Sequence, residues 1–222
     1  MNHFSSEQRA GVYRAIRERR DVRSGFLPDP LPQELLLRLL NSAHQAPSVG
    51  LMQPWRFIVI ESRAIRKRIF EDFQDASTQQ HQTYSGELAR LYGRLTLQGI
   101  LTAPINLCVV CDSNSSQGHS LGRQTMPEAA LYSAVCAIQN LWLAARAEGV
   151  GLGWVSILHP DRVKEILNIP ASMTFVGYFC IGFVEQFASE PELETAGWER
   201  RLTLEDVLRH ETFDQMWNAA ER

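Results

Sequence analysis

The chain has 222 residues, of which 45% are hydrophobic and 21% charged, and its formal net charge at pH 7 is −3. A chain of this length and composition buries one substantial core, so we expect a single globular domain over residues 1–222, of α/β or α+β class. The small net charge excludes a global electrostatic field of the kind that recruits nucleic acid or an anionic membrane.

The predicted elements are helices interspersed with apolar strands. Capping and periodicity signals predict helices from Ser5 or Ser6 to about Arg19, from Pro32 onward, within 62–98 with a break near Ser85 and Gly86, over 127–148 with Pro127 as the first helical residue, and over 161–167. Runs rich in β-forming residues predict strands over 55–60, 105–111, 151–156 and 175–184. Residues 112–126, rich in serine and glycine, predict a loop and are the best candidate for a mobile lid.

Two segments of the sequence indicate that the chain forms a dimer. The predicted helix over 127–148 is hydrophobic nearly all round, so it must be covered on every side, and a dimer interface does this more easily than a monomer. Residues 185–222 are charged and have few apolar anchors beyond Trp198 and Trp217. We therefore expect an extended C-terminal arm that wraps over a partner.

The N-terminal sequence, which does not read as a secretory signal, and the placement of the cysteines both lead us to expect a cytoplasmic protein. The N-terminal residues lack the apolar core of a secretory signal, and polar residues interrupt the apolar stretch 129–147, so we expect neither a signal peptide nor a membrane span. The cysteines lie in apolar runs and are expected to be buried, reduced thiols: Cys108, Cys111, Cys136 and Cys180. Because Cys108 and Cys111 are three apart on a predicted strand, they face opposite sides, and no metal or redox site is expected there.

Arginines crowd the end of the first predicted helix. Arg17, Arg19, Arg20 and Arg23 fall within seven positions, with Asp21 among them. Guanidinium groups match phosphate oxygens and stay charged at any working pH, which favours a small anionic ligand. The alternative is a solvated helix end whose arginines pair with neighbouring carboxylates.

Two loops leading into strands carry further candidate groups. Residues 46–55 hold Pro47, Ser48 and Gln53, which suit a hydrogen-bonded ligand, although a simple proline-rich turn is the alternative. Residues 149–156 hold three glycines that we expect to let the backbone approach a flat ligand, with Ser156 presenting its hydroxyl. This is no dinucleotide fingerprint, because it follows a helix and opens a strand.

Common hydrolase and metalloenzyme motifs are missing from the sequence. It contains no P-loop, nucleophile elbow or H-E-x-x-H motif, and its six histidines show no ligand spacing. We therefore expect no metal.

Four motifs in chain order resemble the FMN-dependent nitroreductase family. They are R-R-D-V-R at 19–23, A-P-S-V-G-L-M-Q-P-W at 46–55, A-A-R-A-E-G-V-G-L-G-W at 144–154 and R-L-T-L-E-D-V at 201–207. Most members have serine and asparagine where this chain has Asp21 and Leu51. With these departures the chain is similar to the branch that consumes reduced FMN and dioxygen to make 5,6-dimethylbenzimidazole, the lower ligand of vitamin B12, leaving erythrose 4-phosphate.

The resemblance implies an α+β fold with a central mixed sheet flanked by helices, in an intertwined homodimer with FMN at the interface. It implies the following cofactor-binding residues, some of them from the partner subunit: Arg19, Arg20, Asp21, Val22, Arg23, Pro47, Ser48, Gln53, Ser156 and Arg201. Asp21 and Ser156 are the implied catalytic residues, the first as a general base and the second near the reactive edge of the flavin. On this resemblance, Leu51 is expected to make the flavin face more apolar, and a separate NAD(P)H-dependent flavin reductase is expected to supply the reduced FMN.

Two other functions stay open at this point. One is an NAD(P)H-dependent reductase of the same fold that acts on cob(II)yrinic acid a,c-diamide or a nitroaromatic. The other is a non-catalytic FMN carrier, against which Asp21 counts, because a carboxylate beside a phosphate weakens binding.

Overall fold

The computed structural model describes residues 3–95 and 97–218. Its centre is a sheet of four strands, β1 (Trp55–Ile60), β2 (Ile105–Cys111), β3 (Val150–Val155) and β4 (Thr174–Phe183), in the order β1-β2-β4-β3. Each strand pair is antiparallel. The mixed sheet that the resemblance implies is therefore not seen among these four strands, although an isolated parallel bridge joins Asp21 to Leu152 of β3.

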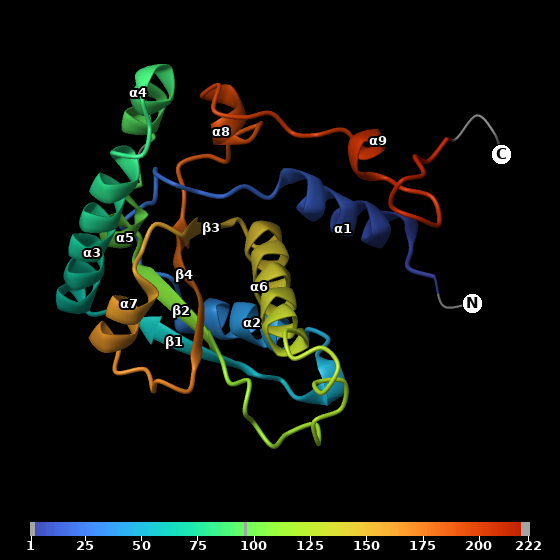
Figure 1. Cartoon of the computed structure of the whole chain (residues 1–222). Helices are drawn as coiled ribbons and strands as arrows, with labels where there is room; N and C mark the ends of the chain where they lie inside the picture. The colour runs from blue at the N-terminus through green and yellow to red at the C-terminus, as the bar shows by residue number, and fades with distance from the viewer. Residues whose placement is uncertain (1–2, 96, 219–222) are drawn as a thin grey trace.

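Helices cover both faces of this sheet (Figure 1). One face packs against α2 (Gln33–His44) and the long α6 (Ala129–Ala147), with a core that includes Leu107, Leu141 and Leu152. The other faces α3 (Arg63–His81), α5 (Gly99–Thr102) and α7 (Pro160–Ile166), with a core that includes Ile69, Val163 and Tyr178. Central β2 is buried along its whole length, as its continuous apolar run predicted.

Several predicted boundaries and burial states need correction. The 62–98 stretch forms α3 and α4 (Gly86–Arg94), with the break where expected, although position 96 lies outside the described residues. Pro127 is not the first residue of α6, which begins at Ala129. Cys108 and Cys111 are buried in the cores on opposite faces of the sheet, as predicted, but Cys136 is exposed on α6.

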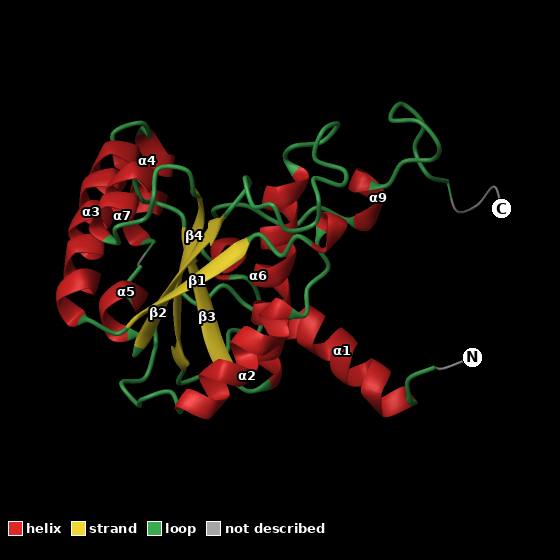
Figure 2. Cartoon of the chain, turned by 90° about the horizontal axis from the view of Figure 1, so that it is seen from below, coloured by secondary structure: helices red, strands yellow, loops and turns green. Residues whose placement is uncertain are grey.

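The two ends of the chain project from the same side of the body (Figures 1 and 2). Helix α1 (Ser6–Glu18) begins in a capping box between Ser5 and Gln8 and buries none of its residues. The arm carries the short helices α8 (Glu192–Thr195) and α9 (Leu204–Val207), and its last expected residues, 219–222, lie outside the described residues. Apolar side chains remain exposed on both ends, including Tyr13 at 63% and Phe213 at 87%.

Candidate functional site

The arginine-rich segment after α1 crosses directly over β3. The Val22 N–H donates to the Leu152 carbonyl at 3.0 Å, and Asp21 forms a parallel bridge with Leu152. A Cβ at Gly153 would lie 2.0 Å from the Val22 carbonyl oxygen, so only glycine permits this crossing. The expectation that the 149–156 glycines admit a flat ligand is thus wrong at Gly153, which makes room for the protein's own backbone.

Asp21 is held at the crossing by contacts to both of its carboxylate oxygens. The Trp154 N–H donates to Oδ1 at 2.7 Å, and the Arg23 guanidinium lies 3.5 Å from Oδ2. Burial raises the pKa of Asp21 above its usual range, against the opposing pull of the Trp154 N–H and Arg23. A carboxylate whose pKa is raised is a stronger proton acceptor than an ordinary aspartate.

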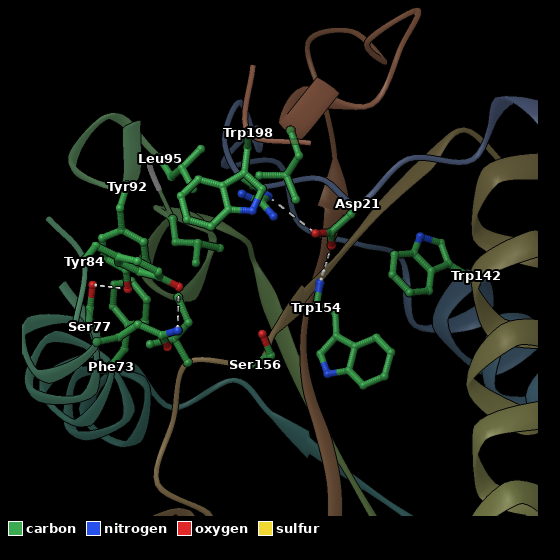
Figure 3. A pocket seen from close by; sticks show the side chains of 15 residues that line it. Asp21, Phe73, Ser77, Tyr84, Tyr92, Leu95, Trp142, Trp154, Ser156 and Trp198 are labelled. Atoms are coloured by element: carbon green, nitrogen blue, oxygen red, sulfur yellow. Dashed lines mark hydrogen bonds and ion pairs between the residues drawn. The ribbon is translucent and has the colours of Figure 1, made fainter. Parts of the chain in front are cut away.

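Asp21 and Ser156 face one cavity of about 520 Å³ (Figure 3). Ser156 follows the last residue of β3, two positions beyond Trp154, so the strand that anchors Asp21 also presents Ser156. The sequence placed these two residues in one site, and the structure brings them to the same cavity.

An aromatic wall closes the far side of this cavity (Figure 3). Ser77 and Tyr92 share a hydrogen bond of 3.1 Å, and Gln80 donates to the Tyr84 hydroxyl at 3.1 Å. Trp198 of the arm packs edge-on against Tyr84, with 5.5 Å between ring centroids. Trp198 therefore anchors this part of the arm on its own chain.

Sequence reasoning missed this wall. Its residues come from α3, α4, the connection between these helices and the arm, and nothing in their local sequence distinguishes them from ordinary core aromatics. The only signal was the isolated tryptophan in an otherwise charged tail.

Arginines gather in a second cavity of about 490 Å³, which is lined by Arg17, Arg19, Arg20 and Arg201 among others. A smaller cavity of about 100 Å³ shares Arg19, Arg20 and Arg201 with it and shares Asp21 and Arg23 with the aromatic cavity. The three cavities therefore adjoin one another in a row that runs from Ser156, past Asp21, to the arginine cluster. Arg201, although about 180 positions from Arg19, joins the cluster as predicted.

Individual arginines in the cluster differ in what they can still bind. The Arg20 guanidinium donates to the carbonyls of Arg17 and Arg19, at 2.9 and 2.7 Å, and to that of Ser189, while its buried Nε has no partner. Arg19 lies over the Trp142 ring, 5.4 Å from the centroid. Burial lowers the pKa of Arg19, and the charges of Arg201 and Arg20 lower it further. This repulsion among cations is what an anion would relieve.

The remaining predicted site residues lie at the other end of α6. The Gln53 N–H donates to Ser48 Oγ at 3.1 Å. Val49, which follows Ser48 in the chain, donates its N–H to Ser133 Oγ of α6 at 3.1 Å. Ser133 and Trp142 are separated by roughly 14 Å of helix axis at ~1.5 Å per residue. Pro47, Ser48 and Gln53 therefore do not join Asp21 within one chain.

The expected lid also lies at that far end. Residues 115–117 line a different cavity of about 800 Å³, together with Gln53 and Trp55, and Gly118 packs against Gly50. The 112–126 loop therefore does not close the Asp21 cavity of its own chain, which the aromatic wall covers instead. Leu51, 67% exposed, also lies beside this loop rather than beside Asp21.

The described residues show neither a metal-binding cluster nor a membrane-spanning helix. Across residues 3–95 and 97–218, no group of three or more histidine, cysteine, aspartate or glutamate residues could hold a metal ion. In the same ranges, no helix has the length and apolarity needed to cross a membrane.

Solved structures share the fold. Iodotyrosine deiodinase bound to FMN and 3-iodo-L-tyrosine superposes with a TM-score of 0.72 at 20% identity, covering 91% of this chain and 100% of that one. Nitroreductase A from Vibrio parahaemolyticus superposes with a TM-score of 0.67 at 16% identity, covering 93% of this chain and 77% of that one.

Sequence relatives are closer. The 5,6-dimethylbenzimidazole synthase of Rhodospirillum rubrum is 45% identical over 198 residues, which is 89% of this chain and 93% of that protein. The synthase of Rhodobacter capsulatus is 41% identical over 203 residues, 91% of this chain and 98% of that protein. The model of the nitroreductase family matches residues 16–183. The chain therefore belongs to the nitroreductase family and, within it, to the group of the 5,6-dimethylbenzimidazole synthases.

Proposed function

We propose that this protein is a 5,6-dimethylbenzimidazole synthase that consumes reduced FMN and dioxygen and leaves erythrose 4-phosphate. The observation that carries the proposal is a row of three adjoining cavities. Asp21 and Ser156 face the cavity with the aromatic wall, here called the aromatic chamber, at one end of the row, and four arginine side chains line the cavity at the other end. The relatives at 45% and 41% identity, which bear that name, support the same reaction.

The residues present fit FMN, which has a planar ring at one end and a phosphate at the other. The aromatic chamber suits the ring, and the arginine-lined cavity suits the phosphate, with the unpartnered Arg20 Nε and the cationic Arg19 as donors. The narrow space between them, lined by Asp21 and Arg23, suits the ribityl chain.

Bound reduced FMN would supply the electrons that activate dioxygen, and its dimethyl-substituted ring and first ribityl carbon would become the product, while the pyrimidine part of the flavin is released. Asp21 then acts at the ribityl end, where bond cleavage requires a proton to be removed, and its raised pKa suits that exchange. The Ser156 hydroxyl orients the ring edge and holds a proton there. Phe73, Tyr84 and Trp198 exclude water from the chamber.

A direct test uses chemically reduced FMN added to the protein in air. The proposed synthase destroys the flavin and releases dimethylbenzimidazole. An NAD(P)H-dependent reductase or an FMN carrier returns oxidised FMN, which would contradict the proposal. We further propose that a separate NAD(P)H-dependent flavin reductase supplies the reduced FMN, and that both proteins work in the cytoplasm.

Homodimer formation is part of the proposal, because it would bring Ser48 and Gln53 of one chain to the Asp21 cavity of the other. The exposed apolar side chains of α1 and α6, including Tyr13 and Val135, supply a surface for a second copy. We expect light scattering to give twice the chain mass of 25.2 kDa. The Val135→Glu variant should be monomeric and lose FMN, whereas Leu88→Glu, at an exposed leucine of α4, should stay dimeric. A wild-type monomer that binds FMN normally would contradict this arrangement.

The arginine cavity predicts a selective loss of affinity for FMN. The Arg19→Ala and Arg201→Ala variants should weaken FMN binding by roughly ten- to 150-fold, the value of one charge-assisted contact, while riboflavin binding changes little because it has no phosphate. Titration of both flavins by fluorescence measures the difference. Arg14→Ala is the control, since Arg14 pairs with Glu18 on the surface of α1. Equal weakening of both flavins would show that the arginines do not bind the phosphate.

A further inference from the structure

A buried carboxylate outside the proposed site ties the segment that carries Ser156 to α3. Asp72 lies on α3 and is 0% exposed. Its Oδ2 accepts the His159 backbone N–H at 2.9 Å, and its Oδ1 accepts the His159 ring Nδ1–H at 2.8 Å. Ser156 lies three residues before His159, with Ile157 and Leu158 between them.

Three further contacts extend this Asp72–His159 interaction, here called the Asp72 clamp, along the same face of α3. Arg162 of α7 lies 3.4 Å from Asp72 Oδ1 and 3.1 Å from Asp75 Oδ2. The second ring nitrogen of His159 lies 3.4 Å from Gln79 Oε1. Both oxygens of Asp72 are therefore occupied, and α3 is fixed against the start of α7 by directional contacts.

The clamp connects two walls of the cavity. Phe73, next to Asp72, and Ser77 line the α3 side of the cavity, while Ser156 and Ile157 line the β3 side. Burying a carboxylate opposes folding unless its contacts compensate, and apolar side chains would hold two helices together as firmly. What directional contacts add is position, and a misplacement of 1 Å in a catalytic group lowers rates by up to ~10²-fold.

We propose that Asp72 and His159 are positioning residues for Ser156, holding its hydroxyl at the distance from the α3 wall that the reaction needs. The proposal rests on the proposed function, because it assigns a consequence to the Ser156 hydroxyl. Neither residue lines the cavity, so both act through the segment between His159 and β3.

The test is a double-mutant cycle between His159 and Ser156, read as dimethylbenzimidazole formed per reduced FMN consumed. His159→Leu removes the ring donor to Asp72 and should lower this yield at least tenfold. His159→Asn should restore most of it, because the asparagine amide nitrogen can take the place of Nδ1. In a Ser156→Ala background, His159→Leu should cause no further loss, since the group it positions is already gone.

Two further measurements separate positioning from loss of fold. Amide hydrogen exchange of residues 156–159 should accelerate in His159→Leu and return toward wild type in His159→Asn. Affinity for oxidised FMN should change less than threefold in both variants. If His159→Leu does not fold, the same cycle run with His159→Ala decides the question.

The outcomes distinguish this inference from the proposed function. An unchanged yield in the folded His159→Leu variant, or equal losses with and without the Ser156 hydroxyl, would overturn the positioning role while leaving the synthase reaction intact. A wild-type protein that makes no dimethylbenzimidazole would instead overturn the proposed function, and the hydrogen exchange result would still report the clamp.

Discussion

Replacement of Asp21 by asparagine should lower dimethylbenzimidazole formation by ~10²–10⁴-fold, the usual contribution of a general base. Asparagine keeps the shape of the side chain and an oxygen for the Trp154 N–H, which donates to Asp21 at 2.7 Å. Affinity for FMN should therefore be retained or improved, because a negative charge near the phosphate is removed. Product measured by chromatography after a single addition of reduced FMN gives the rate.

The same substitution should also change the pH profile. Because burial raises the pKa of Asp21, the wild-type rate should fall as pH drops through that pKa and the carboxylate takes up a proton. This acid limb should be missing from any residual Asp21→Asn activity. Asp29→Asn, at an exposed aspartate, is the control and should match wild type. A loss below tenfold in Asp21→Asn would remove Asp21 from the mechanism.

The second large effect is expected from Ser156→Ala. This variant should bind FMN within about one hydrogen bond of wild type, ~0.5–1.5 kcal/mol, because the backbone and the shape of the site are unchanged. The reaction should then give oxidised, intact FMN and hydrogen peroxide in place of dimethylbenzimidazole, because no hydroxyl hydrogen-bonds the reactive edge of the flavin ring. The ratio of peroxide to dimethylbenzimidazole measures this diversion.

A matched control for Ser156 lies in the same cavity. Ser77→Ala also removes one hydroxyl from the lining, but that hydroxyl is engaged with Tyr92 at 3.1 Å. We expect this variant to keep most of its product. Wild-type product ratios in Ser156→Ala would make Ser156 an ordinary residue at a strand end and leave Asp21 to act alone.

Much of the framework could be predicted because its signals are local. The apolar run of β2 and the alternation of helical and strand patterns located the sheet and its helices, with strand ends within a residue or two. Strand direction was not predictable from those runs, and the sheet proved antiparallel. The glycines of β3 were visible in the sequence, but the atom that needs the space at Gly153, the Val22 carbonyl oxygen, lies on a segment some 130 positions away.

In the site, too, the features with local sequence signals were predicted and those that depend on distant segments were not. Asp21 and Ser156 were found because each lies in a motif that resembles a known family, and the structure places both at one cavity. The aromatic wall and the Asp72 clamp were missed because they depend on how α3 packs against the chain after β3 and against the arm. The position of the 46–55 loop was the hardest to anticipate, since its distance from Asp21 depends on the length of α6.

The most direct test of the central claim follows the carbon atoms of the flavin. Reduced FMN carrying ¹³C at the first ribityl carbon is mixed with the protein in air, and the products are weighed by mass spectrometry. Dimethylbenzimidazole that carries the label, with an equal amount of unlabelled erythrose 4-phosphate, is the result predicted for this chain. Labelled FMN recovered intact and oxidised, with no dimethylbenzimidazole, would contradict it.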